Sequence, residues 1–204
     1  MQNKYLNGRN RSLNIVSVIA GVLLWLLVIV AVLRMAFALI YFKVYVVGSS
    51  MSGTLIGAPS KDAEGGDYVY AFRDNKPRRG DIVVIETDHK TIIKRVIALG
   101  GDTVKIIDGV LYLNGEVKSE PYVLAENNTP SENNFDEITV PEGKMFCMGD
   151  NRNVSIDSRS EIYGCMPVNW TVGIVANWSM SLKTSVTAFN TFIDFTVPAS
   201  DKRH

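Results

Sequence analysis

An apolar run near the N-terminus constrains this chain more than any other feature. Residues 15–33 are apolar except for Ser17 and Gly21, and residues 35–42 extend the run. A helix needs about 20 apolar residues to cross the hydrocarbon core of a bilayer. No second apolar run of that length follows. We therefore expect one transmembrane helix and a single folded domain after it.

The flanks of this run predict its orientation. Residues 1–14 are polar and basic and contain no acidic residue, which places the N-terminus in the cytoplasm. A cleavable signal peptide is the alternative, because Ala36 and Ala38 form a small-x-small pattern. The run is longer than the usual apolar region of about 7–15 residues, and Arg34 separates it from that pattern. Both observations favour an anchor that is not cleaved.

The sequence after the anchor has the pattern of β-structure. Short β-branched runs alternate with turn signals, among them Asp108-Gly109 and Asn114-Gly115, which favour tight hairpins. We predict a mostly β fold, with one transmembrane helix followed by an antiparallel β domain. The expected divisions are a basic cytoplasmic leader (1–14), an anchor with an interfacial segment (15–42), a β-rich domain (43–182) and a C-terminal tail that lies on a surface (183–204).

Composition argues against several classes of protein. The 21 basic and 21 acidic residues of the 204-residue chain give a formal net charge of zero, which offers no basic surface for nucleic acid. His89 and His204 are the only histidines, and they form no zinc-ligand pattern with Cys147 and Cys165. We expect no metal and no organic cofactor. A Cys147–Cys165 disulfide is possible in principle, but two buried thiols are the favoured interpretation.

Ser50 and Lys94 are candidates for a nucleophile and its base. Ser50 lies in a small-residue stretch just after the anchor. A serine nucleophile needs a base, and His89 lies in a polar turn. Lys94 interrupts an apolar β run, where burial would lower its pKa from about 10.4 and supply a neutral amine. The alternative is a surface lysine that extends from a sheet edge.

A polar loop over residues 149–159 could support this pair. Neighbouring side chains on a strand face opposite ways, so Arg95 would face away from Lys94 and need an anion, Asp150 or Asp157. Ser155 could orient the lysine amine, while the acidic residues and Arg159 support the loop. A loop this polar could equally be solvated.

Four segments together resemble bacterial type I signal peptidases, in order and spacing. They are residues 48–55, 79–83, 94–102 and 149–159. The resemblance implies a membrane-bound serine endopeptidase that removes signal peptides from translocated preproteins, without a cofactor. It assigns Ser50 as nucleophile, Lys94 as general base and Ser155 as the hydroxyl that positions the lysine. The supporting network would be Arg95, Asp150, Asp157 and Arg159.

The sequence departs from the family pattern around the serine. Gly53 replaces a common proline, which suggests a looser turn, and Gly100-Gly101-Asp102 stands where Pro-Gly-Asp is common. Gly48 replaces a serine that joins the oxyanion hole in some members. The hole would then depend on backbone N–H groups of Ser50 and Gly48.

The resemblance also implies a substrate that binds as an added strand, with shallow pockets for small side chains before the cut. The candidate pocket residues are Val46, Val47, Met51, Leu55, Ile92 and Ile93. Plain core packing is the alternative for each of them. The expected partners are emerging preproteins and the lipid bilayer, with the enzyme single-pass in a bacterial cell membrane and its catalytic domain extracytoplasmic.

Three other classes compete with this hypothesis. Endoplasmic-reticulum signal peptidases use histidine where this chain has Lys94, and a glycan at Asn153 would block the proposed site. Self-cleaving repressors use Ser/Lys chemistry on a related fold, but the apolar run argues against them. A membrane-tethered β domain that binds a surface partner without catalysis remains the alternative from another class.

Overall fold

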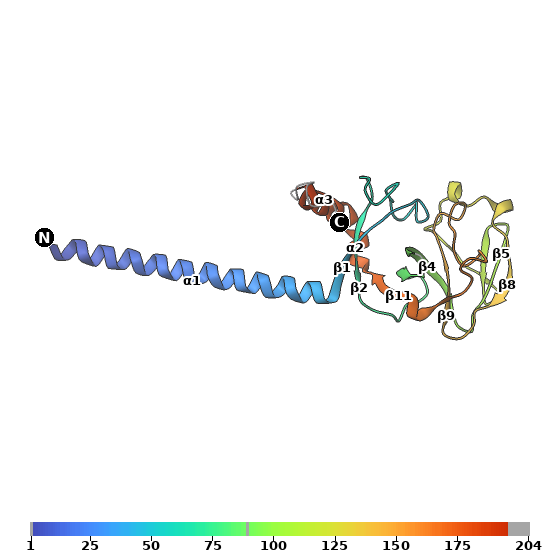
Figure 1. Ribbon diagram of the computed structural model, residues 1–204, viewed down its shortest axis with the longest axis horizontal. Coiled ribbons are helices and arrows are strands. Elements are labelled where there is room, and N and C mark those ends of the chain that lie inside the picture. Colours follow the sequence, from blue (N-terminus) through green and yellow to red (C-terminus); the bar gives the residue numbers. More distant parts are fainter. Residues whose placement is uncertain (1, 89, 196–204) are drawn as a thin grey trace. The chain divides into compact units, whose positions relative to one another are not determined.

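The computed structural model describes residues 2–88 and 90–195 (Figure 1). The chain divides into two compact units, Met1–Tyr41 and Phe42–His204. The first unit contains helix α1 (Gln2–Ile40). Its segment Ile15–Ile40 is, within the described residues, the one helix long and apolar enough to cross a membrane, and none of it is buried inside the protein. The apolar run therefore forms the long helix that the sequence predicts.

The second unit is built from two β-sheets. The larger sheet has the strand order β1-β2-β11-β3-β4-β9-β10, and the smaller has the order β7-β6-β5-β8. The strands of the larger sheet are β1 (Tyr41–Tyr45), β2 (Tyr68–Phe72), β3 (Ile82–Glu86), β4 (Thr91–Leu99), β9 (Lys144–Met148), β10 (Met166–Pro167) and β11 (Thr171–Val175). Those of the smaller are β5 (Thr103–Ile107), β6 (Val110–Leu113), β7 (Glu116–Val117) and β8 (Phe135–Thr139).

Adjacent strands pair in the antiparallel sense, for example β3 with β4 and β4 with β9. The predicted hairpin turns are present, because Asp108 and Asn114 adopt φ of 49° and 55° and each precedes a glycine of positive φ. These features confirm the mostly β fold with one long N-terminal helix.

Most helical elements of the second unit have three to five residues, and α3 has 13. Among the described residues they are three 3-10 turns, Ala125–Asn127, Pro130–Glu132 and Val168–Trp170, and the helices α2 (Asn177–Ser181) and α3 (Lys183–Phe195). The expected C-terminal tail thus begins as a helix that packs against β2, and residues 196–204 lie outside the described part.

Strand β4 runs between hydrophobic clusters on both of its faces. Ile92 and Val96 pack with residues such as Val83, while Ile93 packs against a different cluster that includes Val46. Because these clusters cover both faces of β4, most of its side chains are shielded from water. Any charged side chain in the middle of this strand is therefore desolvated.

Candidate active site

Ser50 lies in a compact turn directly after β1. The N–H groups of Thr54 and Leu55 both donate to the Met51 carbonyl, at 3.0 and 2.8 Å. The Met51 and Leu55 side chains are almost fully buried and hold the turn on the core, while Ser50 stays half-buried. The Asn151 N–H donates to the Ser50 carbonyl at 3.0 Å, which attaches the polar loop to the serine.

The Lys94 amine reaches Ser50 across 44 residues of sequence. Its Nζ donates to Ser50 Oγ at 2.8 Å, and the residue is 4% exposed. The surface-lysine interpretation is therefore wrong. Burial lowers the Lys94 pKa from 10.5 to about 8, although the Asp157 charge partly opposes this effect. The geometry gives a serine hydroxyl in contact with an amine that loses its proton more easily than a free lysine.

Arg95 faces the opposite side of β4 and binds Asp150. Its Nε and Nη2 donate to the two carboxylate oxygens at 2.8 and 2.6 Å, which is a bidentate pair. Its Nη1 donates to the Gly80 carbonyl at 2.8 Å. The Thr54 hydroxyl donates to the same carboxylate at 2.5 Å. Of the two acidic candidates that the sequence offered for Arg95, the structure places Asp150 against it.

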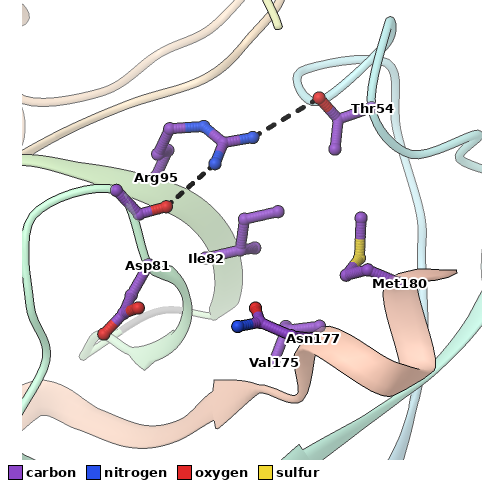
Figure 2. A pocket seen from close by; sticks show the side chains of 8 residues that line it. Thr54, Asp81, Ile82, Arg95, Val175, Asn177 and Met180 are labelled. Atoms are coloured by element: carbon purple, nitrogen blue, oxygen red, sulfur yellow. Dashed lines mark hydrogen bonds between the residues drawn. The ribbon is translucent and has the colours of Figure 1, made fainter.

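Figure 2 shows the cavity beside Arg95, with the guanidinium directed at Thr54 and at the Gly80 carbonyl. The cavity has a volume of about 200 Å³ and lies between Ile82, Val175 and Met180. None of the predicted pocket residues lines it.

Asp157 pairs with Arg159 inside the polar loop. The Arg159 Nε and Nη2 each donate to this carboxylate at 2.9 Å, and the Gly149 N–H donates at 3.0 Å. Burial alone would raise the pKa of Asp157, but Arg159 and the Gly149 N–H outweigh it, and the net pKa is lowered. Asp157 is therefore a stable anion that partly opposes the desolvation of Lys94.

Ser155 lies close to the nucleophile but makes no hydrogen bond to the lysine. Its Oγ is buried and has no hydrogen-bond partner among the described residues, so the expected bond to Lys94 is not formed. It also helps to lower the Asp157 pKa, although it makes no hydrogen bond of normal geometry there. A Cβ at Gly149 would lie 2.3 Å from Ser155 Oγ and 2.4 Å from the Ser50 carbonyl oxygen, so only glycine fits between them.

The backbone around Gly48 does not match the predicted oxyanion hole. The Gly48 N–H donates to the Ala58 carbonyl at 2.8 Å and is therefore engaged. The Ser50 N–H, in contrast, has no backbone partner within the described residues. The geometry leaves the Ser50 N–H as the available donor of the predicted pair.

Gly53 gives the turn a different conformation rather than a looser one. Its φ is +103°, which proline cannot adopt because its ring fixes φ near −65°. A Cβ at this position would lie 3.2 Å from Leu124 and 3.3 Å from the Tyr122 carbonyl. The departure from the family pattern at this position is therefore accommodated by a tightly packed turn.

Most of the predicted pocket residues belong to the core. Val46, Met51 and Leu55 are at most 2% exposed and share one hydrophobic cluster, against which Ile93 packs. Ile92 is buried in another cluster. Val47 is 39% exposed. Val46, Met51, Leu55 and Ile92 are therefore core residues, and the partly buried Ile93 packs against the core. Val47 is the one exposed residue among the six pocket candidates.

Several contacts of the site could not be inferred from the sequence. The Tyr122 ring lies 3.9 Å from the Arg95 guanidinium carbon, and the Tyr122 hydroxyl donates to Glu120 at 2.8 Å. Glu120 in turn binds Arg152 in a buried bidentate pair. These residues lie in irregular segments without periodicity, so no pattern marked them. Thr54 lay within one of the four family segments, but nothing indicated its role.

The two cysteines do not form a disulfide. Cys147 is buried and Cys165 is partly buried, both are free thiols, and burial raises the pKa of each. Within the described residues, no group of three or more His, Cys, Asp or Glu side chains is placed to hold a metal ion.

Most of the chain matches a known protein family. Residues 18–179 match the family described as signal peptidase, peptidase S26. A signal peptidase I of Bacillus licheniformis is 38% identical over 148 residues, which is 66% of this chain and 75% of that protein. The signal peptidase I S of Bacillus subtilis (strain 168) is 44% identical over 89 residues, 40% of this chain and 48% of that protein. A crystal structure of a signal peptidase I from Enterococcus faecalis V583 covers 50% of this chain and 97% of its own, at 34% identity and a TM-score of 0.43.

Proposed function

Because this chain belongs to the signal peptidase family, peptidase S26, and is a serine endopeptidase, we propose that it removes signal peptides from translocated preproteins with a Ser50/Lys94 dyad. The observation that carries this proposal is the 2.8 Å contact between Lys94 Nζ and Ser50 Oγ. The lysine is desolvated, and its pKa is lowered to about 8. A serine next to such an amine has the base that nucleophilic catalysis requires.

The proposed reaction passes through an acyl-enzyme. Neutral Lys94 accepts the Ser50 proton as Oγ attacks the scissile carbonyl, and the Ser50 N–H donates to the developing oxyanion. Collapse of the tetrahedral intermediate breaks the peptide bond while the Lys94 ammonium protonates the leaving amine. Water then attacks the ester, Lys94 accepts its proton, and that proton returns to Ser50 Oγ as the acid product leaves.

The lowered pKa determines how much enzyme is ready to react. With a pKa of about 8, roughly a tenth of Lys94 is neutral at pH 7, against less than about 0.1% for a free lysine. The fraction of competent enzyme therefore rises by about two orders of magnitude, mainly through burial of the amine. Asp157 keeps the pKa from falling further.

The first unit supplies the proposed anchor. Ile15–Ile40 has the length and apolar composition of a membrane span. With a basic leader before it, the N-terminus would be cytoplasmic and the β domain extracytoplasmic in a bacterial cell membrane. Emerging preproteins and the bilayer would be the partners, and the anchor would hold Ser50 at the face where signal peptides appear.

Substrate binding would use the open edge of the larger sheet. Strand β1 is the terminal strand of that sheet and leads directly to the Ser50 turn. An extended peptide could add there as a further strand. Val47 is exposed beside the turn and would contact the residues before the cut, where an Ala-x-Ala-like site places small side chains.

Cleavage of a preprotein with an Ala-x-Ala site tests the proposal. Detergent-solubilised full-length enzyme should release the mature chain, and mass spectrometry should place the cut after the second alanine. The variants Ser50→Ala and Lys94→Ala should each lose at least about 10³-fold in rate, because the dyad acts as a unit. The variants Ser52→Ala and Lys105→Ala are matched controls that should cleave normally. Cleavage by both dyad variants would favour the non-catalytic binding domain.

A further inference from the structure

A lysine on the C-terminal helix contacts the turn that carries Ser50. Lys183 is the first residue of α3 and lies beyond residues 18–179, which match the family. Its Nζ donates to the Thr54 carbonyl at 2.6 Å, across 129 residues of sequence. The same Nζ lies 3.6 Å from Asp67 Oδ2, and the lysine side chain is only 32% exposed. This cation therefore reaches two acceptors next to the nucleophile.

Asp67 connects Val46 and Ile56, which lie before and after Ser50 in the sequence. Its Oδ2 accepts from the Ile56 N–H at 2.8 Å. Its backbone N–H donates to the Ile56 carbonyl at 2.8 Å, and its carbonyl accepts from the Val46 N–H at 3.0 Å. Asp67 is buried, so its carboxylate needs a cation nearby. Lys183 supplies that charge where the chain enters and leaves the Ser50 turn.

Thr54 is held from two directions. Its hydroxyl donates to Asp150, which Arg95 binds, and its carbonyl accepts from Lys183. Its N–H donates to the Met51 carbonyl, one residue after Ser50. A displacement at Thr54 would therefore reach the nucleophile through a single turn of backbone.

Helix α3 is fixed to the strand that follows Asp67. The Thr187 hydroxyl accepts from the Tyr68 N–H at 2.9 Å. Asn190 is buried, and its Oδ1 lies 3.5 Å from the Tyr70 hydroxyl. Both partners are on β2, against which α3 packs (Figure 1). Lys183 is thus presented from a docked helix rather than from a free tail.

We propose that Lys183 is a positioning residue for Ser50, through which α3 sets the geometry of the nucleophile turn. This inference rests on the proposed peptidase function. Lys183 does not reach the reacting atoms; it fixes the Thr54 carbonyl and neutralises Asp67. Loss of the ammonium would let the turn relax and lengthen the contact between Ser50 Oγ and Lys94 Nζ.

Steady-state kinetics of full-length Lys183→Met and Lys183→Arg test the proposal. Because small displacements in a catalytic geometry cost up to about 10²-fold, kcat of Lys183→Met should fall by about 10- to 100-fold while KM stays within about twofold. Lys183→Arg keeps a donor and a positive charge and should recover most of kcat. Lys118→Met, which removes an exposed ion pair with Glu116, is the matched control and should keep the wild-type kcat. A wild-type kcat in Lys183→Met would overturn the proposal, and so would a fall that Lys183→Arg fails to recover.

Hydrogen exchange separates this inference from the proposed function. The Thr54 and Leu55 amides should exchange faster in Lys183→Met than in wild type or Lys118→Met, because their bonds to Met51 loosen. If the wild type fails to cleave any preprotein, the proposed function is wrong while faster exchange still supports the contact between α3 and the turn. Unchanged exchange of these amides would overturn the positioning role whatever the kinetics.

Discussion

Lys94 and Arg95 are neighbouring basic residues on β4, and both are buried, but they have different kinds of partner. Lys94 is 4% exposed and Arg95 is 9% exposed. Arg95 has a carboxylate partner bound through two hydrogen bonds. Lys94 contacts a neutral hydroxyl, while the nearby Asp157 is bound by Arg159. The two side chains differ in their partners far more than in their burial.

This difference assigns a separate task to each face of the strand. A buried cation with a bidentate carboxylate stays charged and fixes the elements that it joins. A buried cation without its own anion relieves the cost of desolvation by losing its proton, so its pKa falls. The Arg95 side therefore provides rigidity, and the Lys94 side provides a titratable base.

Removal of the Arg95 charge should have the largest effect on stability. Arg95→Met leaves the Asp150 carboxylate buried without its cation, which should lower the free energy of unfolding by about 3–5 kcal/mol. Denaturant unfolding of the full chain in detergent, followed by tryptophan fluorescence, measures this change. The exposed Arg78→Met should stay within about 0.5 kcal/mol of wild type. Equal effects of the two variants would contradict the structural role of the pair.

Removal of the Lys94 charge should change stability in the opposite direction and raise the free energy of unfolding. A lowering of the Lys94 pKa from 10.5 to about 8 corresponds to about 3 kcal/mol of destabilisation by the protonated lysine. Loss of the hydrogen bond to Ser50 offsets about 1 kcal/mol of this gain. Lys94→Met should therefore be more stable than wild type by about 2 kcal/mol at pH 7.

The pH dependence of wild-type stability follows from the same lowering of the Lys94 pKa. Below about pH 8 the lysine is protonated in both folded and unfolded chains, so its full cost is present. Between about pH 8 and 10.5 the unfolded chain binds more protons, so wild-type stability rises relative to Lys94→Met. The gap between the two proteins should close over that range and then reverse by about 1 kcal/mol, because wild type keeps the hydrogen bond to Ser50. A gap that is constant with pH would show that desolvation of Lys94 is not its cause.

Thr54 connects the two faces and should give the smallest change. Thr54→Val removes the hydroxyl that donates to Asp150 but leaves the Arg95 pair in place, so unfolding should become easier by about 1 kcal/mol. Thr54→Ser keeps the hydroxyl and is the matched control. Cleavage should slow more in Thr54→Val than in Thr54→Ser, because the turn of Ser50 loses one of its two supports. Equal rates for both variants would mean that the Arg95 face does not influence the nucleophile.

The sequence predicted the features that depend on local residue patterns and on the alternation of side chains along a strand. The apolar run, the hairpin turns and the mostly β fold follow from local patterns, and the β alternation correctly separated Lys94 from Arg95. The contact between Lys94 and Ser50 agrees with the pairing expected from the family resemblance.

Other features depend on backbone geometry and on distant contacts, which no local pattern records. The bond from Gly48 to Ala58 and the positive φ of Gly53 are set by how the turn closes. The burial of Met51 and Leu55 depends on strands far along the chain. The contact between Lys183 and Thr54 joins a tail without strand periodicity to the nucleophile turn.

A direct titration of Lys94 tests the central claim most sharply. NMR of detergent-solubilised full-length enzyme with isotope-labelled lysine side chains, with Lys94→Met to assign the signal, measures its pKa. We predict a pKa of about 8, together with a kcat/KM that rises with pH through the same value. A Lys94 pKa near 10.5, the ordinary lysine value, would contradict the assignment of this lysine as the desolvated general base of Ser50.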